Sequence, residues 1–286
     1  TISIKLNDKQ GGKRMSDIKN SVLPEIIEPI SNAIQQNIPE TAKQTDGALS
    51  TVVGFFNNVV LYPVKKANLT FKYKLEAFED DLKEKIKDIP EENLQVPPVK
   101  IAGPVLEALR YAYDEEELRE MYEEMLAKAM DNRKVHQVHR SYVDAVKQME
   151  PLDAQVLRRI YDYNEVTTSH VRLYKSGSQQ YYLNAMPYHY NDILCDLGDP
   201  FQISASISNL IRLGLLISTA GFLKEGVAER IEKEPYIQER FGIYNQLQGG
   251  VTISVPVGCE IISLDSYGRY FVDVCMSKKK LGSNTD

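Results

Sequence analysis

Residues 101–131 read IAGPVLEALRYAYDEEELREMYEEMLAKAMD, and His139-Arg140-Ser141-Tyr142 follows shortly after. Gly103 can act as an N-cap, and Pro104 suits the first helical position because proline lacks an N–H and its φ is already helical. Asp114, with Glu117 three residues later, predicts a capping box at the start of a second helix. The stretch therefore predicts two consecutive helices that pack as neighbours.

The two predicted helices each carry an apolar face. Large apolar residues recur at helical spacing, and a face of this kind is usually buried. We expect the two helices to present one common core, formed by Leu106, Leu109, Leu118, Met121 and Met125.

Six glutamates between residues 115 and 124 could be read as metal ligands or catalytic carboxylates. An acidic first turn that meets the helix dipole, followed by a solvated face, explains them more simply. Carboxylate metal sites in helical bundles add a Glu-x-x-His on an inward face. His136 and His139 instead lie beyond the expected helix end near Asp131, and two histidines fall short of a zinc site. No metal-ligating residue is predicted.

The turn at His139 has a structural interpretation. Ser141 is predicted to cap a helix over residues 142–149, with His139 hydrogen-bonding back across the turn. Proton transfer by His139 is the alternative, but the sequence supplies no nucleophile or partner for it. We therefore predict no catalytic residue here.

Together, the Gly-Pro start, the acidic capping box and the His-x-Ser-aromatic turn resemble the signature of the abortive infection alpha family, bacterial proteins associated with phage defence. In that family the turn usually reads His-Pro-Ser-Phe, whereas this chain carries Arg140 and Tyr142. The resemblance is firmest over residues 90–153. It implies a phage-defence role and no particular reaction, and its signature positions are Gly103, Pro104, Asp114, Glu117, His139 and Ser141.

Composition narrows the function classes. A chain of 286 residues, 43% hydrophobic, can build a large core, which we expect to be split between two domains. The net charge of −6 disfavours general nucleic-acid binding, because phosphate contacts need clustered cations. Three widely spaced cysteines, Cys195, Cys259 and Cys275, suit a reducing cytoplasm. Phosphate-loop, dinucleotide, GxSxG, kinase and HExxH motifs are absent from the sequence, so neither an enzyme nor a cofactor is predicted.

The predicted fold is mainly α, with an N-terminal helical bundle followed by a winged-helix-like α+β domain. The expected boundaries are N-terminal helices over residues 15–89, a Pro-rich connector and signature helical region over 90–150, and the winged-helix-like domain over 151–286. Residues 1–14 are expected to be an untranslated leader or disordered, because codons for Gln10-Gly11-Gly12 would resemble a ribosome-binding sequence upstream of Met15.

The N-terminal part predicts helices over residues 21–38, 47–62 and 68–89, each with apolar residues at helical period. Residues 47–64 form an uncharged segment, and this segment is long enough to be considered as a membrane span. Polar Asn57-Asn58 favours a buried helix of the bundle, and a membrane-inserting segment stays open as the alternative.

The C-terminal part predicts a helix over residues 151–161, a hairpin over 171–183 and a helix over 201–213. Strands over 215–218 and 261–264 follow, and Asp265 starts a last helix. This order resembles a winged helix with a long wing over residues 219–250.

The helix over residues 201–213 would be the recognition helix of such a domain. It is expected to expose Gln202, Ser204, Ser206, Asn209 and Arg212. One arginine suits a DNA groove poorly, and the predicted wing is acidic. A protein-interaction or structural role is therefore favoured over DNA binding.

The sequence thus predicts a cytoplasmic, non-enzymatic phage-defence protein that binds or senses a protein partner from host or phage. A toxic effector that acts on membranes through residues 47–64 is the first alternative, and a DNA-binding regulator is the second. Self-association stays open. A cavity that gathers His136, His139 and acidic side chains would instead favour an enzyme.

Overall fold

The structure, a computed structural model, describes residues 45–56 and 69–276. The N-terminal elements are α3 (Thr45–Phe56), α4 (Leu69–Ile86), η4 (Glu91–Asn93), α5 (Val99–Ala112), α6 (Glu116–Ala129), η5 (Val135–Gln137) and α7 (Arg140–Val146). The C-terminal elements are α8 (Pro151–Tyr163), β1 (Glu165–Thr168), β2 (Arg172–Lys175), η6 (Asp192–Leu197), α9 (Pro200–Arg212), β3 (Leu216–Phe222), α10 (Val227–Glu232), α11 (Pro235–Gln248), β4 (Val251–Ser254), β5 (Gly258–Leu264) and α12 (Ser266–Cys275). The predicted leader, the helix over 21–38 and the second part of 47–64 lie outside the described residues.

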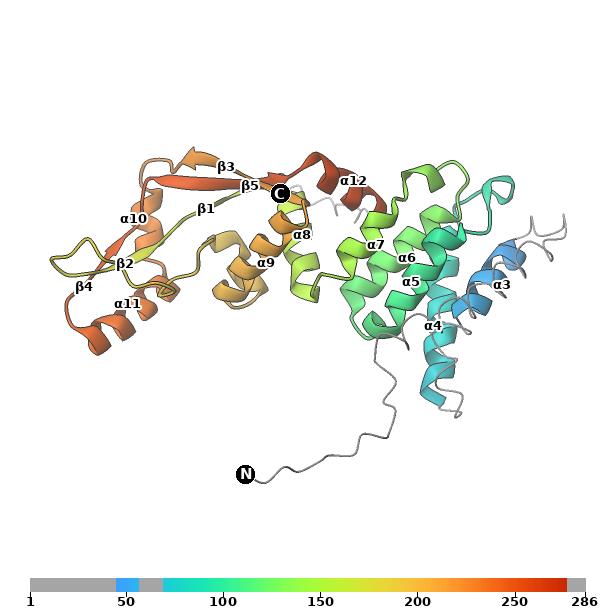
Figure 1. The fold of residues 1–286 in the computed structure, drawn as a ribbon, viewed down its shortest axis with the longest axis horizontal. Helices are drawn as coiled ribbons and strands as arrows, with labels where there is room; N and C mark the ends of the chain where they lie inside the picture. The colour runs from blue at the N-terminus through green and yellow to red at the C-terminus, as the bar shows by residue number, and fades with distance from the viewer. Residues whose placement is uncertain (1–44, 57–68, 277–286) are drawn as a thin grey trace, which may run out of the picture.

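The elements form an elongated arrangement. Helices α3 to α7 gather at one end, the strands with α10 and α11 lie at the other, and α8, α9 and α12 lie between them (Figure 1). The fold is mixed α+β, with mostly helices and small antiparallel sheets. The predicted predominance of helix is therefore present, while the bundle, the winged helix and the domain boundaries remain predictions.

Helix α5 begins at Val99, five residues earlier than predicted. Pro98 is its N-cap, so the expectation of Gly103 as N-cap and Pro104 as first residue is wrong. Pro104 lies inside the helix, where it cannot donate a hydrogen bond to the turn before it. Gly103 eases this placement, since it has no Cβ to clash with the following proline ring.

Helix α6 begins at Glu116 with Glu115 as N-cap and no side-chain capping bond, so the predicted capping box of Asp114 and Glu117 is wrong. The carboxylate of Asp114 lies 2.6 Å from the Lys74 ammonium of α4. Glu117 accepts a hydrogen bond from Gln155 of α8. Both acidic side chains therefore bind neighbouring helices.

Helix α7 is capped by His139 and not, as predicted, by Ser141. Nδ1 of His139 accepts a hydrogen bond from the Ser141 amide at 3.2 Å, which confirms the bond back across the turn. The Ser141 hydroxyl, freed from capping, lies 2.8 Å from the Tyr267 hydroxyl of α12. The turn thus joins the helical end of the molecule to the last helix.

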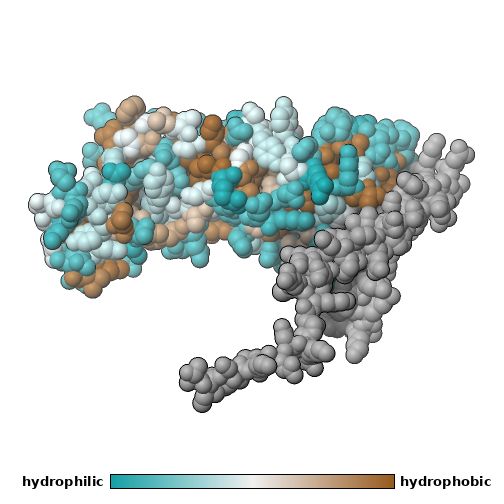
Figure 2. Space-filling view, viewed as in Figure 1, coloured by the Kyte–Doolittle hydropathy of each residue, from teal (hydrophilic) through white to brown (hydrophobic). Residues whose placement is uncertain are grey.

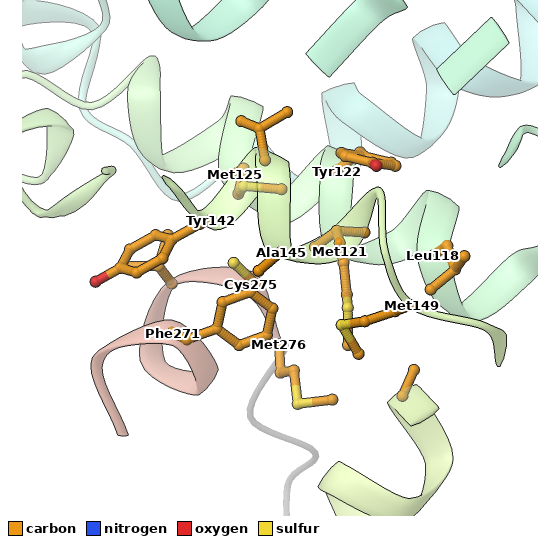
Figure 3. Packing of buried hydrophobic residues seen from close by; sticks show 14 of the residues in the cluster. Leu118, Met121, Tyr122, Met125, Tyr142, Ala145, Met149, Phe271, Cys275 and Met276 are labelled. Atoms are coloured by element: carbon orange, nitrogen blue, oxygen red, sulfur yellow. The ribbon is translucent and has the colours of Figure 1, made fainter. Parts of the chain in front are cut away.

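The predicted common core of α5 and α6 is confirmed, since its five residues are 0–3% exposed. This core extends through α7 and reaches α12. Tyr142 of α7 packs edge to face against Phe271 of α12, with ring centroids 5.6 Å apart. Figure 3 shows these rings beside Met121, Met149 and Cys275. The signature helices and the C-terminal helix therefore share one apolar core.

The Pro-rich connector is an ordered strap. Leu94 forms a bridge with Asp131, and the Gln95 amide donates to the Met130 carbonyl at 2.8 Å. These bonds satisfy carbonyl groups at the end of α6. The connector consequently fixes the start of α5 relative to the end of α6.

The C-terminal strands form two antiparallel sheets, with order β1-β5-β3 and β2-β4. The predicted strands over 215–218 and 261–264 are present as β3 and β5, and Asp265 caps α12 as predicted. The predicted wing over 219–250 is wrong in form, because β3 extends to Phe222 and helices α10 and α11 occupy much of the remainder. The predicted hairpin over 171–183 is only partly formed. Strand β2 pairs with β4, and within the predicted hairpin it forms one bridge, between Tyr174 and Tyr181.

Helix α9 uses most of its polar side chains internally. Ser204 and Ser206 are 6% and 4% exposed, so the prediction that they face solvent is wrong. Asn209 donates to Asp153 Oδ2 of α8 at 2.8 Å, and Arg212 donates to Gln148 Oε1 at 3.1 Å. The polar face of α9 therefore packs against the start of α8.

Helix α3, which contains the described part of the apolar segment, is 12 residues long. Among the helices of residues 45–56 and 69–276, none has the length and apolarity needed to cross a bilayer.

Candidate functional site

Two histidines from separate loops lie opposite each other beside the three-stranded sheet. An antiparallel bridge pairs Ser169 with Tyr190, through hydrogen bonds of 2.8 and 3.2 Å in the two directions. In an antiparallel pair, the residues next to the bridge also face each other. The bridge therefore places His170 opposite His189, and their ring centroids are 6.3 Å apart.

Glu260 of β5 completes the group. It pairs with Thr168 of β1, two residues before His170. Its carboxylate Oε1 lies 3.6 Å from His170 Nε2, and its Oε2 lies 3.3 Å from His189 Nδ1. One ligand-type atom from each of the three side chains lies within 4.8 Å of the other two.

Neighbouring groups hold His189 and Glu260 in place. The Thr168 hydroxyl lies 3.3 Å from His189 Nδ1, and the His189 amide donates to the Ser204 hydroxyl at 2.9 Å. The Tyr188 hydroxyl donates to Glu260 Oε1 at 3.3 Å. The cluster is thus oriented by residues of β1, β5, α9 and the loop before η6.

Burial sets the charge state of His189. His189 is 4% exposed, and this burial lowers its pKa to about 4, although the Glu260 carboxylate acts in the opposite direction. His189 is therefore neutral at pH 7 and keeps a lone pair on its ring. Nε2 of His170 is buried and has no hydrogen-bond partner among the residues that the structure describes, which is uncommon for a polar atom in a folded protein.

A pocket of about 340 Å³ adjoins the cluster. His170 belongs to both, and the ring of Tyr188, which also lines the pocket, lies 4.2 Å from the His170 ring between centroids. Aromatic and apolar side chains form the rest of the wall, together with Arg172 and serines of α9; its aromatic and aliphatic members include Tyr181, Tyr182, Leu183, Met186 and Phe201. We call this hollow the aromatic pocket.

The residues singled out from the sequence lie elsewhere. His136 and His139 are exposed, in η5 and at the start of α7, and the other signature positions belong to α5, α6 and α7 or flank them. Within the described residues, His170, His189 and Glu260 form the cluster that could hold a metal ion. Nothing in their sequence spacing indicated it, because long-range strand pairing brings them together.

A family model described as abortive infection alpha matches residues 70–275. The chain belongs to the abortive infection alpha family. Neither the curated proteins nor the solved structures gave a match. Membership associates the chain with abortive infection, a form of phage defence, and the match includes both the signature helices and the aromatic pocket.

Proposed function

We propose that this protein acts in phage defence, in the cytoplasm, by binding a protein partner from host or phage at the aromatic pocket. The observation that carries the proposal is the set of large, exposed side chains around that pocket. Leu183 is 74% exposed, Tyr188 58% and Tyr181 45%.

Such a composition suits a protein interface. The centres of interfaces are enriched in tyrosine and arginine, and a few such residues usually supply most of the binding energy. The Arg172 guanidinium lies over the Tyr181 ring, 5.2 Å from its centroid. This stacking holds the flexible Arg172 side chain in place before a partner arrives, which lowers the entropy cost of binding.

The order of elements supports an interaction module of winged-helix type. Helix α8, β1, α9, β3 and β5 follow one another, with β5 between the other two strands. Arg212, the arginine of α9, is engaged by Asn209 and Gln148, which argues against a role of this helix in a DNA groove. We therefore favour a protein partner over duplex DNA.

Apolar surface is also visible in the space-filling view over the end of α11, where Leu247 is 73% exposed (Figure 2). We place the partner at the aromatic pocket because its exposed side chains surround one hollow, beside the Arg172 guanidinium stacked on Tyr181.

The test compares phage protection by cells that produce Leu183→Ser or Tyr181→Ser with protection by the wild-type protein. Tyr111→Ser is the matched control, because Tyr111 is 78% exposed on α5 at the other end of the molecule. We expect both pocket variants to keep the wild-type melting temperature and to lose protection, and the control to keep both. Full protection by folded Leu183→Ser and Tyr181→Ser proteins would overturn the proposal.

A further inference from the structure

We propose that His170, His189 and Glu260 form a binding site for a divalent transition-metal ion of the Zn²⁺ class. The inference rests on the geometry of these three residues and does not depend on the identity of any protein partner.

The distances within the cluster suit such an ion. Bonds of about 2.0–2.2 Å in a tetrahedral zinc site place the ligand atoms roughly 3.3–3.6 Å apart. The Glu260 oxygens lie 3.6 Å from His170 Nε2 and 3.3 Å from His189 Nδ1. These two distances involve different carboxylate oxygens, Oε1 and Oε2, so the carboxylate must rotate to bring one oxygen and both nitrogens around a common centre. Ligand atoms of the three side chains already lie within 4.8 Å of one another.

A cluster held by hydrogen bonds alone explains the surroundings of His170 less well than a metal site does. Nε2 of His170 is buried but has no hydrogen-bond partner within residues 45–56 and 69–276, because its 3.6 Å distance from the Glu260 carboxylate exceeds hydrogen-bond length. A metal ion would give this nitrogen the partner it lacks.

The surroundings resemble those of a metal site with an open position. The Thr168 hydroxyl lies 3.3 Å from His189 Nδ1, so a metal ion bound to that nitrogen would replace this contact. The Tyr188 hydroxyl donates to the Glu260 carboxylate and orients it. Ligand-orienting contacts of this kind tune metal affinity. Three protein ligands leave a tetrahedral ion one free position, and His170 lines the aromatic pocket. A small molecule or a partner side chain in that pocket could therefore reach the ion.

The donor set predicts which ions bind. Two imidazoles and one carboxylate suit Zn²⁺, Co²⁺ and related ions, whereas Mg²⁺ and Ca²⁺ prefer all-oxygen sites. Zn²⁺ is therefore the probe for affinity and Co²⁺ the probe for coordination geometry.

The experiment uses the full chain without a histidine tag, stripped of metal by a chelator, and titrates Zn²⁺ by calorimetry. We expect about one ion per chain at this site with micromolar or tighter affinity, and a higher melting temperature with Zn²⁺. Mg²⁺ should do neither. Co²⁺ should give the visible absorption of a four- or five-coordinate site.

Two ligand variants and one histidine control complete the design. His170→Ala and Glu260→Gln should each weaken Zn²⁺ binding by about 100-fold or more and remove the thermal shift, since each deletes one of three ligands. His136→Ala, which alters an exposed histidine of η5, should bind Zn²⁺ like the wild type. His170 is partly exposed, so its variant should remain folded even if Glu260→Gln does not. Failure of the wild type to bind Zn²⁺, or unchanged binding by folded His170→Ala, would overturn the proposal.

Discussion

Gly268 lies where α12 passes directly against the backbone of Leu215. A Cβ atom at this position would lie 1.9 Å from the Leu215 carbonyl oxygen and 2.8 Å from its carbon. The same oxygen accepts a hydrogen bond from the amide of Asp265, the N-cap of α12, at 3.1 Å. The start of the helix is therefore tied to the backbone that a larger residue at 268 would meet.

The Gly268→Ala substitution should lower the free energy of unfolding. Real Cβ contacts are essentially never shorter than 3.0 Å, so α12 would have to move by about 1 Å. Such a shift would disturb the buried Phe271 and Val272. Helix propensity alone favours alanine over glycine by about 1 kcal/mol, whereas overpacking typically costs about 1–3 kcal/mol and occasionally more. Because backbone atoms form this contact, we expect a net loss of roughly 2 kcal/mol.

The assay is denaturant unfolding, followed by circular dichroism, with Gly242→Ala as the matched control. Gly242 lies inside α11, and an added Cβ there meets nothing within 4 Å. The control should gain up to about 1 kcal/mol, so the two Gly→Ala changes should differ in sign. A Gly268→Ala protein as stable as the wild type would refute the reasoning.

Three further outcomes are expected. Leu109→Ala should lose about 2–5 kcal/mol in denaturant unfolding, because Leu109 is 0% exposed in the shared core, and an unchanged midpoint would remove it from that core. Burial raises the pKa of Glu123 to about 7, so the folded state holds this proton more tightly than the unfolded chain and loses stability as pH rises from about 4.5 through 7. As the pH rises from about 4 to about 8, the free energy of unfolding of Glu123→Gln should therefore increase relative to that of the wild type by up to roughly 3 kcal/mol. A difference between the two proteins that does not change with pH would contradict this. Duplex DNA should not bind the protein tightly at physiological salt in fluorescence anisotropy, and sub-micromolar binding that Arg212→Ala abolishes would show the opposite.

The sequence predicted the helices well where their apolar period was strong. The facing residues Leu109 and Met125 were assigned to one core from spacing alone, and both are fully buried. The ends of these helices were less predictable, since tertiary contacts fix them. The strap before Val99 sets the start of α5, and Lys74 binds the Asp114 carboxylate that was expected to cap α6.

Helices α10 and α11 were missed because they lack a continuous apolar stripe. Ile237 is the buried residue of α11 and Ile231 that of α10, so the sequence shows no sustained helical period there. Without that period, residues 219–250 looked like an acidic wing.

The metal-type cluster could not be predicted from spacing. His170 and His189 meet through a single bridge, and Glu260 reaches them through its pairing with β1. Such long-range pairings depend on the folded topology. Buried histidines could be considered as candidate ligands, but which histidines are buried cannot be read from the sequence.

The most direct test of partner binding is photo-cross-linking in cells, with a photo-reactive phenylalanine analogue at position 183 or, as a control, at position 111. Both positions are exposed, and only the first lies at the aromatic pocket. We predict that the analogue at 183, in a protein that still protects against phage, gives one reproducible protein adduct in uninfected or infected cells, and that the analogue at 111 does not give it. A protecting protein that forms no adduct at 183 under either condition would contradict the proposal that the aromatic pocket binds a partner.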